Sequence, residues 1–206
     1  MTINQVVLAW SFMALQGTRR LYESITLTKP SQSKMWVGLW LLGIAYYVFM
    51  GISIWIEGIG QCPALIHTMT NLSVASLNLA NSPASHVEIS KPSMKTFIAV
   101  PIFILASGVQ HDCHEYLASL KKYTLPQHPI FRMIVCPHYT SECVIYIAIA
   151  IVAAPKGQLV NKTILAGLGF VMSNLAVTAD LTRKFYVEKF GVDELKGRWR
   201  MVPYIY

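Results

Sequence analysis

The chain has 206 residues, of which 54% are hydrophobic and 13% are charged, and its formal net charge is +7. This composition excludes a disordered or collagen-like chain and is too apolar for a typical soluble domain. The four cysteines are scattered and form no CxxC pair, which excludes a small fold stapled by disulfides. We therefore predict an all-α integral membrane protein that forms one domain over residues 1–206.

Five apolar segments are expected to be transmembrane helices. The clearest is 35–56, which contains no charged residue and reaches about 33 Å as a helix, enough to cross a bilayer. The first segment has no basic region before it, and two arginines follow it, which is typical of a membrane helix and not of a cleaved signal peptide. The other segments lie at about residues 2–16, 96–110, 136–154 and 158–179.

The connections after the second and third segments have different character. Residues 57–95 are rich in Ser, Asn, Ala and Pro, and we predict a lumenal loop there with a short interfacial helix near 64–80. The third segment continues through HDCHEYLASLKKY, residues 111–123, as an amphipathic helix. The following TLPQHP string is expected to break that helix, because proline cannot continue it.

The basic residues predict the orientation in the membrane. If the five segments alternate, 13 of the 17 lysines and arginines fall on one side and four on the other. Cytosolic loops carry such an excess, so the basic side and the C-terminal tail are expected in the cytosol. The net charge is thus a topology signal and no indication of nucleic-acid binding. Asn71 and Asn161 begin N-x-S/T triplets on the opposite, lumenal side, where glycosylation is possible.

Two polar residues stand out in the fourth segment. Glu142 lies inside an apolar run, where an uncompensated charge costs several kcal/mol. His138 precedes it by four residues, so both side chains share a helix face and can bond to each other or to a shared ligand. A buried polar pair that only ties helices together is an equally good interpretation. Asn174 and Asp180 pose the same choice in the fifth segment.

Metal and dinucleotide signatures are weak. The HDCH string at 111–114 gathers ligand types, but consecutive helical positions point about 100° apart, so we predict no metal site. The pair of glycines in 167–169 is followed by Met172 where the dinucleotide fingerprint needs glycine. A phosphorylated cofactor could still meet a basic cytosolic surface formed by Arg19, Lys121, Arg183, Lys184, Arg198 and Arg200.

Several sequence strings resemble one known family. HDCHEYLASLKK, CPHYTSECVIY, RKFYVEKFG and the ending RWRMVPYIY follow one another as in the C-terminal domain, here about 95–206, of the steroid 5α-reductase family. CPHYTSE, with the upstream strings TRRLYES, SKMWVGLWLLG and IWIEG, is most similar to the fungal polyprenol (polyprenal) reductase branch. The resemblance covers essentially the whole chain.

This resemblance implies a fold and a reaction. Members of the family are all-helical, multi-pass enzymes of the endoplasmic reticulum membrane that use NADPH to reduce a double bond conjugated to a carbonyl. For the polyprenol branch it implies an oxidoreductase that saturates the α-isoprene unit during dolichol synthesis for protein N-glycosylation. The implied partners are a polyisoprenoid lipid substrate and membrane lipid, with no nucleic acid and no obligate protein partner.

The resemblance also implies which residues form the site. By position, Gln16 stands where a steroid reductase has a tyrosine that contacts the carbonyl, and it is the candidate catalytic residue. The family's additional N-terminal helices, which include a carboxylate that polarises the carbonyl, have no counterpart in this chain. The implied cofactor-binding residues are Arg19, or Arg20 in a register shifted by one residue, together with His114, Lys121, His138, Glu142, Asn174 and Tyr186.

Three other functions stay open at this point. A trans-2-enoyl-CoA reductase has the same fold and reaction type, although CPHYTSE and RRLYES argue against it. A membrane methyltransferase of similar architecture would bind S-adenosylmethionine in place of NADPH. A truncated, non-catalytic membrane protein would bind neither cofactor.

Overall fold

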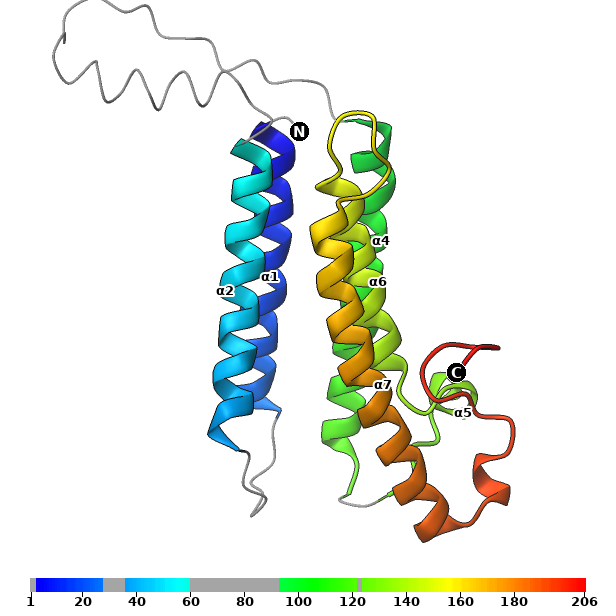
Figure 1. The fold of residues 1–206 in the computed structure, drawn as a ribbon. Coiled ribbons are helices and arrows are strands. Elements are labelled where there is room, and N and C mark those ends of the chain that lie inside the picture. Colours follow the sequence, from blue (N-terminus) through cyan, green and yellow to red (C-terminus); the bar gives the residue numbers. More distant parts are fainter. Residues whose placement is uncertain (1–2, 28–35, 60–92, 122–123) are drawn as a thin grey trace, which may run out of the picture.

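The computed structural model describes residues 3–27, 36–59, 93–121 and 124–206, and helices dominate them (Figure 1). Within these ranges no strand forms, and the one isolated β-bridge joins Ile134 to Trp199. A five-residue helix, α5 (Pro129–Met133), and a 3-10 turn, η1 (Asp193–Leu195), complete the fold. The long helices are α1 (Ile3–Thr26), α2 (Val37–Ile59), α4 (Met94–Ser119), α6 (Pro137–Val152) and α7 (Lys162–Phe190).

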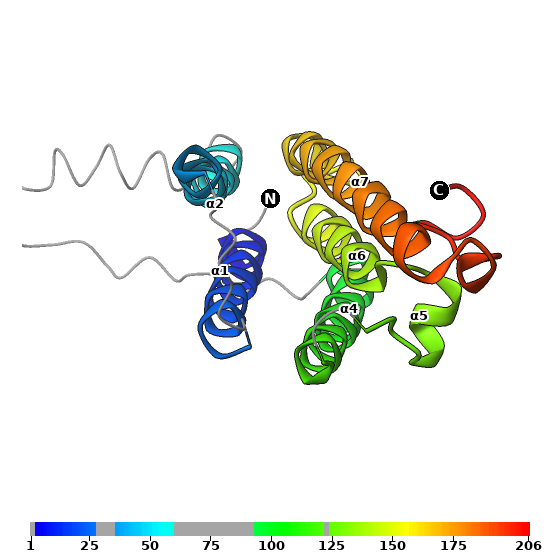
Figure 2. The ribbon, with the colours of Figure 1, turned by 90° about the horizontal axis from the view of Figure 1, so that it is seen from below.

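The long helices run side by side and alternate in direction along the chain (Figure 1). Seen along the bundle, α6 lies between α4 and α7, and the α1–α2 pair stands beside them (Figure 2). Contacts of α1 with α4 and α6, and of α2 with α7, join the two groups. The apolar residues of α6 are largely buried because this helix has neighbours on several sides.

Close helix contacts have identifiable causes. Phe12 of α1 stacks on Phe103 of α4, with ring centroids 4.0 Å apart. At the α2–α7 contact, a Cβ atom added to Gly167 would lie 2.7 Å from the Met50 Sδ atom. A larger residue at Gly167 would therefore displace the end of the Met50 side chain, and small residues are common where apolar helices approach each other. Gly167, which belongs to no phosphate-binding loop, has this packing role.

The first and third helices are longer than the predicted apolar segments. The apolar segments end near residues 16 and 110, whereas α1 continues to Thr26 and α4 to Ser119. Both extensions are polar, and polar side chains of one bond to polar side chains of the other. The predicted helix of residues 111–123 is confirmed up to Ser119, and the chain leaves the helix at Leu120.

Asn161 begins α7 and is not free for modification. Its side chain is buried, accepts a hydrogen bond from the Ile164 backbone N–H and donates one to the Ala153 carbonyl. This is an N-cap, so α7 begins at Lys162, later than the predicted residue 158. Glycosylation of Asn161 is incompatible with this arrangement. Asn71 and the predicted interfacial helix near 64–80 lie outside the described residues.

The C-terminal residues fold back onto the bundle. The backbone N–H groups of Val135 and Cys136 donate to the carbonyls of Trp199 and Arg200, at 2.7 and 3.0 Å. Leu195 and Met201 of this segment are buried. The predicted tail is therefore a packed element that holds the start of α6.

Two of the described helices, α4 and α7, are long and apolar enough to cross a membrane. The apolar helical stretches of α2 and α6 within the described residues are shorter. Apolar side chains on α4 and α7 remain exposed, including Phe97, Leu105, Val177 and Leu181. Exposed apolar surface of this extent is costly in water and favourable in lipid.

Candidate functional site

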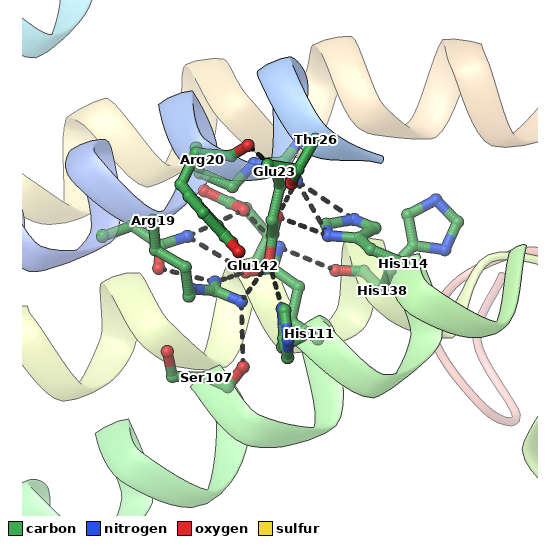
Figure 3. Close-up of polar contacts among 12 residues, drawn as sticks. Arg19, Arg20, Glu23, Thr26, Ser107, His111, His114, His138 and Glu142 are labelled. Carbon is green, nitrogen blue, oxygen red and sulfur yellow. Dashed lines mark hydrogen bonds and ion pairs between the residues drawn. The ribbon is translucent and has the colours of Figure 1, made fainter. Parts of the chain in front are cut away.

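Polar side chains of three helices meet inside the bundle (Figure 3). Gln16, Arg19, Arg20 and Glu23 are spaced three or four residues apart on α1, so they share one helix face. That face lies against the polar end of α4 and the beginning of α6. Because neighbouring helices run in opposite directions, polar stretches that are distant in sequence come to the same level of the bundle.

The deepest part is a cluster of two amides and one carboxylate. Gln16, Gln110 and Glu142 expose only 0%, 1% and 9% of their surface. The Gln16 Nε2 atom donates to Glu142 Oε2 and to Gln110 Oε1, both at 3.1 Å. The Gln110 Nε2 atom donates to Glu142 and, at 3.2 Å, to the His138 carbonyl. A buried carboxylate is costly without such donors, so this cluster fixes α1, α4 and α6 relative to one another.

Glu23 is the centre of a second cluster nearer the end of α1. Its carboxylate is 3% exposed and lies 3.0 Å from Arg19, 2.8 Å from Arg20, 2.9 Å from His111 and 2.7 Å from His114. Both histidines of the HDCH string thus point to one glutamate.

The surroundings of Glu23 lower its pKa. The residue follows the apolar stretch 2–16, outside the segment expected in the membrane. Burial by itself raises the pKa of the Glu23 carboxyl, but hydrogen bonds from His111 and Arg20 and nearby positive charge outweigh it and bring the pKa from 4.5 to about 2. Glu23 is therefore ionised at neutral pH and neutralises part of the arginine charge.

Arg19 connects the two clusters. Its guanidinium bonds to Glu23 on one side and donates to Gln16 Oε1 at 2.8 Å and to Gln110 on the other. It also donates to the Ser107 carbonyl at 3.0 Å. The result is a continuous network from Glu23 to Glu142.

Three buried polar atoms at the site, Arg19 Nε, the Tyr46 hydroxyl and His138 Nδ1, have no hydrogen-bond partner among the described residues. The His138 ring lies edge-on to His114, with centroids 5.3 Å apart, and Arg20 Nη1 lies 2.8 Å from His114 Nδ1. Buried polar atoms are usually paired, so an unpaired one beside a cavity indicates a place for a ligand.

A cavity of about 400 Å³ adjoins this network. It lies between α1, α2, α4, α6 and α7, and its lining combines polar and aromatic side chains. Its volume is within the range of small-molecule and cofactor sites. The polar lining is formed by Arg20, Gln110, His114, His138, Glu142 and Asn174, and the aromatic lining by Tyr46, Tyr47, Tyr139, Tyr146 and Phe170.

The structure brings most of the predicted site residues together. His114, His138, Glu142 and Asn174 line the cavity, while Gln16 and Arg19 lie behind its polar lining. Two predicted cofactor residues lie elsewhere. Lys121 is exposed after the end of α4, and half-buried Tyr186 packs against Phe185 and Phe190 on α7. Their assignments stay predictions from the resemblance.

The sequence left open whether Glu142 and His138 bond to each other or to a shared ligand. The hydrogen bonds to Glu142 come from Gln16 and Gln110, and His138 contributes its backbone carbonyl to Gln110. The packing interpretation and the ligand interpretation of Glu142 therefore both have support, because the carboxylate ties helices and also faces the cavity.

The predicted basic cytosolic surface is largely used for internal contacts. Arg198 donates to the carbonyls of Pro126 and Phe131, at 3.2 and 3.3 Å. Arg200 and Lys184 both pair with Asp180, at 2.7 and 2.9 Å. Asp180 thus contacts the C-terminal segment, which supports its packing interpretation. Arg198 and Arg200 thus join separate elements, whereas Lys184 pairs within α7.

Sequence reasoning missed three residues of the network. Gln110 ends the predicted third segment and lies one helical turn before His114, the spacing that could have identified it. Glu23 and His111 lacked any such signal, because their roles depend on contact between α1 and α4.

Comparison with known proteins adds family evidence. The family described as 3-oxo-5-alpha-steroid 4-dehydrogenase matches residues 65–206, more than half of the chain. Polyprenal reductase 2 of Oryza sativa subsp. japonica is 28% identical, with 98% of this chain and 59% of the relative covered. Polyprenal reductase of Xenopus laevis is 29% identical, with 90% and 54% covered.

A third relative agrees with these two. Polyprenal reductase of Saccharomyces cerevisiae is 29% identical, with 91% of this chain and 60% of the relative covered. The chain thus spans between 54% and 60% of the length of these three relatives. The match includes α4, α6, α7 and the C-terminal segment, which together supply most of the cavity wall. The chain therefore belongs to the 3-oxo-5-alpha-steroid 4-dehydrogenase family, the steroid 5α-reductases that its motifs resemble.

Proposed function

We propose that this chain acts as an NADPH-dependent polyprenal reductase that saturates the α-isoprene double bond during dolichol synthesis. Its relatives named polyprenal reductase suggest the substrate class, and its family suggests a reductase. The observation that carries the proposal is the polar lining of the cavity, where buried Glu142 is held by two glutamines and the His138 Nδ1 atom lacks a partner. Polar groups maintained at this cost in an apolar bundle usually serve function.

The residues at the cavity fit a nicotinamide cofactor. A carboxamide needs both hydrogen-bond acceptors and donors, and Glu142, His138 and Asn174 offer both kinds on one cavity. When bound, NADPH would supply the hydride. The aromatic side chains of the cavity lining can exclude water from the reacting atoms.

Residues of α1 would act on the substrate carbonyl. Negative charge grows on the carbonyl oxygen as an enal is reduced at its β-carbon, so a hydrogen-bond donor must be held near that oxygen. Gln16 and Arg20 are the donors that α1 supplies on the side of the polar lining. Gln16 already donates to Gln110 and Glu142, so contact with substrate would require it to exchange one of these bonds.

The first test is Glu142→Gln. Loss of the charge weakens the bonds to a bound cofactor, so NADPH affinity or turnover should fall by roughly 10- to 100-fold, as for hydrogen bonds to charged groups. Binding and reduction of polyprenal would be measured in detergent-solubilised membranes. The matched control is Glu188→Gln, the same change at an exposed site on α7, which should alter neither quantity.

A second variant separates binding from folding. His138→Phe removes the unpartnered Nδ1 atom and keeps an aromatic ring among Phe131, Tyr139 and His114. Removing an unpaired buried polar atom does not destabilise a fold, so thermal stability should hold or rise while NADPH affinity falls roughly tenfold. Unchanged affinity in both variants would contradict the proposal.

The same assay separates the other functions. Binding of S-adenosylmethionine in place of NADPH would identify a methyltransferase. Reduction of a trans-2-enoyl-CoA, with no reduction of polyprenal, would identify the fatty-acid elongation enzyme. Affinity for neither cofactor would identify a non-catalytic chain.

We further propose that the protein is a multi-pass protein of the endoplasmic reticulum membrane with a cytosolic C-terminus. The uneven distribution of lysines and arginines between the two sides of the membrane supports the orientation. The apolar helices support membrane insertion. Product made in that membrane would serve protein N-glycosylation. The proposal includes lipid as the surrounding partner and requires no nucleic acid and no obligate protein partner.

A further inference from the structure

A second, apolar groove lies beside the polar cavity. It has a volume of about 710 Å³ and runs between α1 and α2. Thr18 and Arg20 are the polar exceptions in a lining that is otherwise apolar, aromatic or glycine. Such a lining suits a hydrocarbon chain and offers almost nothing to a charged or heavily hydrated molecule.

Absent side chains give the groove its width. Gly17 on α1 and Gly43 and Gly51 on α2 are among its lining residues. A Cβ atom added to Gly43 would meet no atom within 4 Å, so this position borders open space. The Cβ atom of a larger residue at Gly43 would therefore enter the groove without striking the protein.

The groove and the polar cavity meet. Arg20, Gly43 and Tyr47 line both of them, so the two spaces share one boundary. Arg20 is the charged lining residue of the groove, and it lies at that boundary. Together the spaces match a molecule with a long apolar chain and one polar, reactive end.

We propose that the α1–α2 groove holds the isoprenoid chain of the substrate. The reactive end of the substrate then reaches the polar cavity by passing Gly43, where the two spaces meet. This inference rests on the proposed function for the identity of the reactive end. It adds the path of the chain and makes Gly43 a specificity-determining residue. Binding of the chain buries apolar surface on both partners, which favours long isoprenoids over short ones.

The test is Gly43→Leu, measured in membranes with two aldehydes. Leucine narrows the passage for a chain that must lie across it, so kcat/KM for long-chain polyprenal should fall at least about tenfold, the scale on which pocket contacts discriminate. Because Gly43 also lines the polar cavity, reduction of a two-isoprene aldehyde, short enough to lie within that cavity, should fall as well, but by less than reduction of the long chain. The matched control is Gly169→Leu on α7, which also borders open space but lines neither cavity. Equal losses for both aldehydes would overturn the proposal.

A binding experiment judges the groove even if the chain proves inactive. Long-chain polyprenol with a photoreactive diazirine on its chain should label peptides of α1 and α2, and Gly43→Leu should reduce this labelling severalfold. Unlabelled polyprenol should compete, while phosphatidylcholine should not. Equal competition by phosphatidylcholine would assign the groove to bulk lipid and overturn the inference. Failure of the wild-type chain to reduce either aldehyde, with specific labelling retained, would instead contradict the proposed function alone.

Discussion

Glutamine side chains allow a carboxylate and an arginine to share the interior of an apolar bundle. A glutamine amide donates through nitrogen and accepts through oxygen. Gln16 and Gln110 use both atoms, accepting from Arg19 and donating to Glu142. A leucine at either position would leave both charged groups short of partners, and that loss costs more than the apolar contact gains.

Glu23→Gln tests the second cluster and its pH dependence. Because the pKa of Glu23 is lowered in the folded protein, its ionised form stabilises the fold above about pH 4.5, and this contribution disappears as the pH falls toward about 2. The variant should lose on the order of 2 kcal/mol of stability at neutral pH. The difference from the wild type should shrink below pH 4.5.

Thermal unfolding in detergent at several pH values measures this effect. Glu115→Gln, the same change at an exposed position of α4, is the control and should leave the melting temperature unchanged. A Glu23→Gln protein as stable as the wild type at neutral pH would show that the cluster contributes nothing to folding.

At the level of elements, the C-terminal segment determines where α6 begins. Its backbone pairs with Val135 and Cys136, directly before the helix that carries His138 and Glu142. Thr140 adds a hydrogen bond from α6 to the Met201 carbonyl. The segment therefore supports the helix turn that carries His138 and Glu142, two residues of the cavity lining. None of its own side chains lines that cavity.

Leu195→Ala should weaken the packing of the C-terminal segment against the bundle. Leu195 is 0% exposed, and truncating a buried leucine costs about 2–5 kcal/mol. The expected results are a lower melting temperature and faster cleavage by trypsin at Lys196, Arg198 and Arg200 in detergent. The control is Ile205→Ala at a position that is 82% exposed, where stability should change by less than about 0.5 kcal/mol. Equal trypsin sensitivity of both variants would show that Leu195 does not anchor the segment.

For the whole molecule, alternating helices decide which end is polar. Gln16 to Glu23 come late in α1, Gln110 and His114 come late in α4, and His138 and Glu142 come early in α6. Antiparallel packing places these stretches at one end of the bundle (Figure 1). The same end carries the C-terminal segment, so the cavity should open toward the side of the membrane that holds the basic residues.

Protease treatment of intact microsomes tests this orientation. A tag placed after Tyr206 should be removed by protease added from outside, because the C-terminus is expected in the cytosol. A lumenal marker protein should stay intact in the same sample until detergent is added. Protection of the tag until that point would reverse the predicted topology.

Local sequence determined the helices and part of the site. Long apolar runs specify helices whatever their neighbours, because backbone groups in an apolar environment must bond within the segment. Glu142 and His138 could be singled out because charge and imidazole are unusual in such a run. Family motifs placed His114, Arg19 and Asn174 near them. These inferences need only residue type, spacing and order.

Tertiary structure alone decided how the polar groups pair. Gln16 bonds to residues 94 and 126 positions away, and Glu23 meets histidines 88 and 91 positions away. Such pairs depend on which faces of α1, α4 and α6 touch, and side-chain packing between helices sets that geometry, not the pattern along any one helix. For the same reason only the fold shows that Asn161 is a buried cap and that the C-terminal segment is packed.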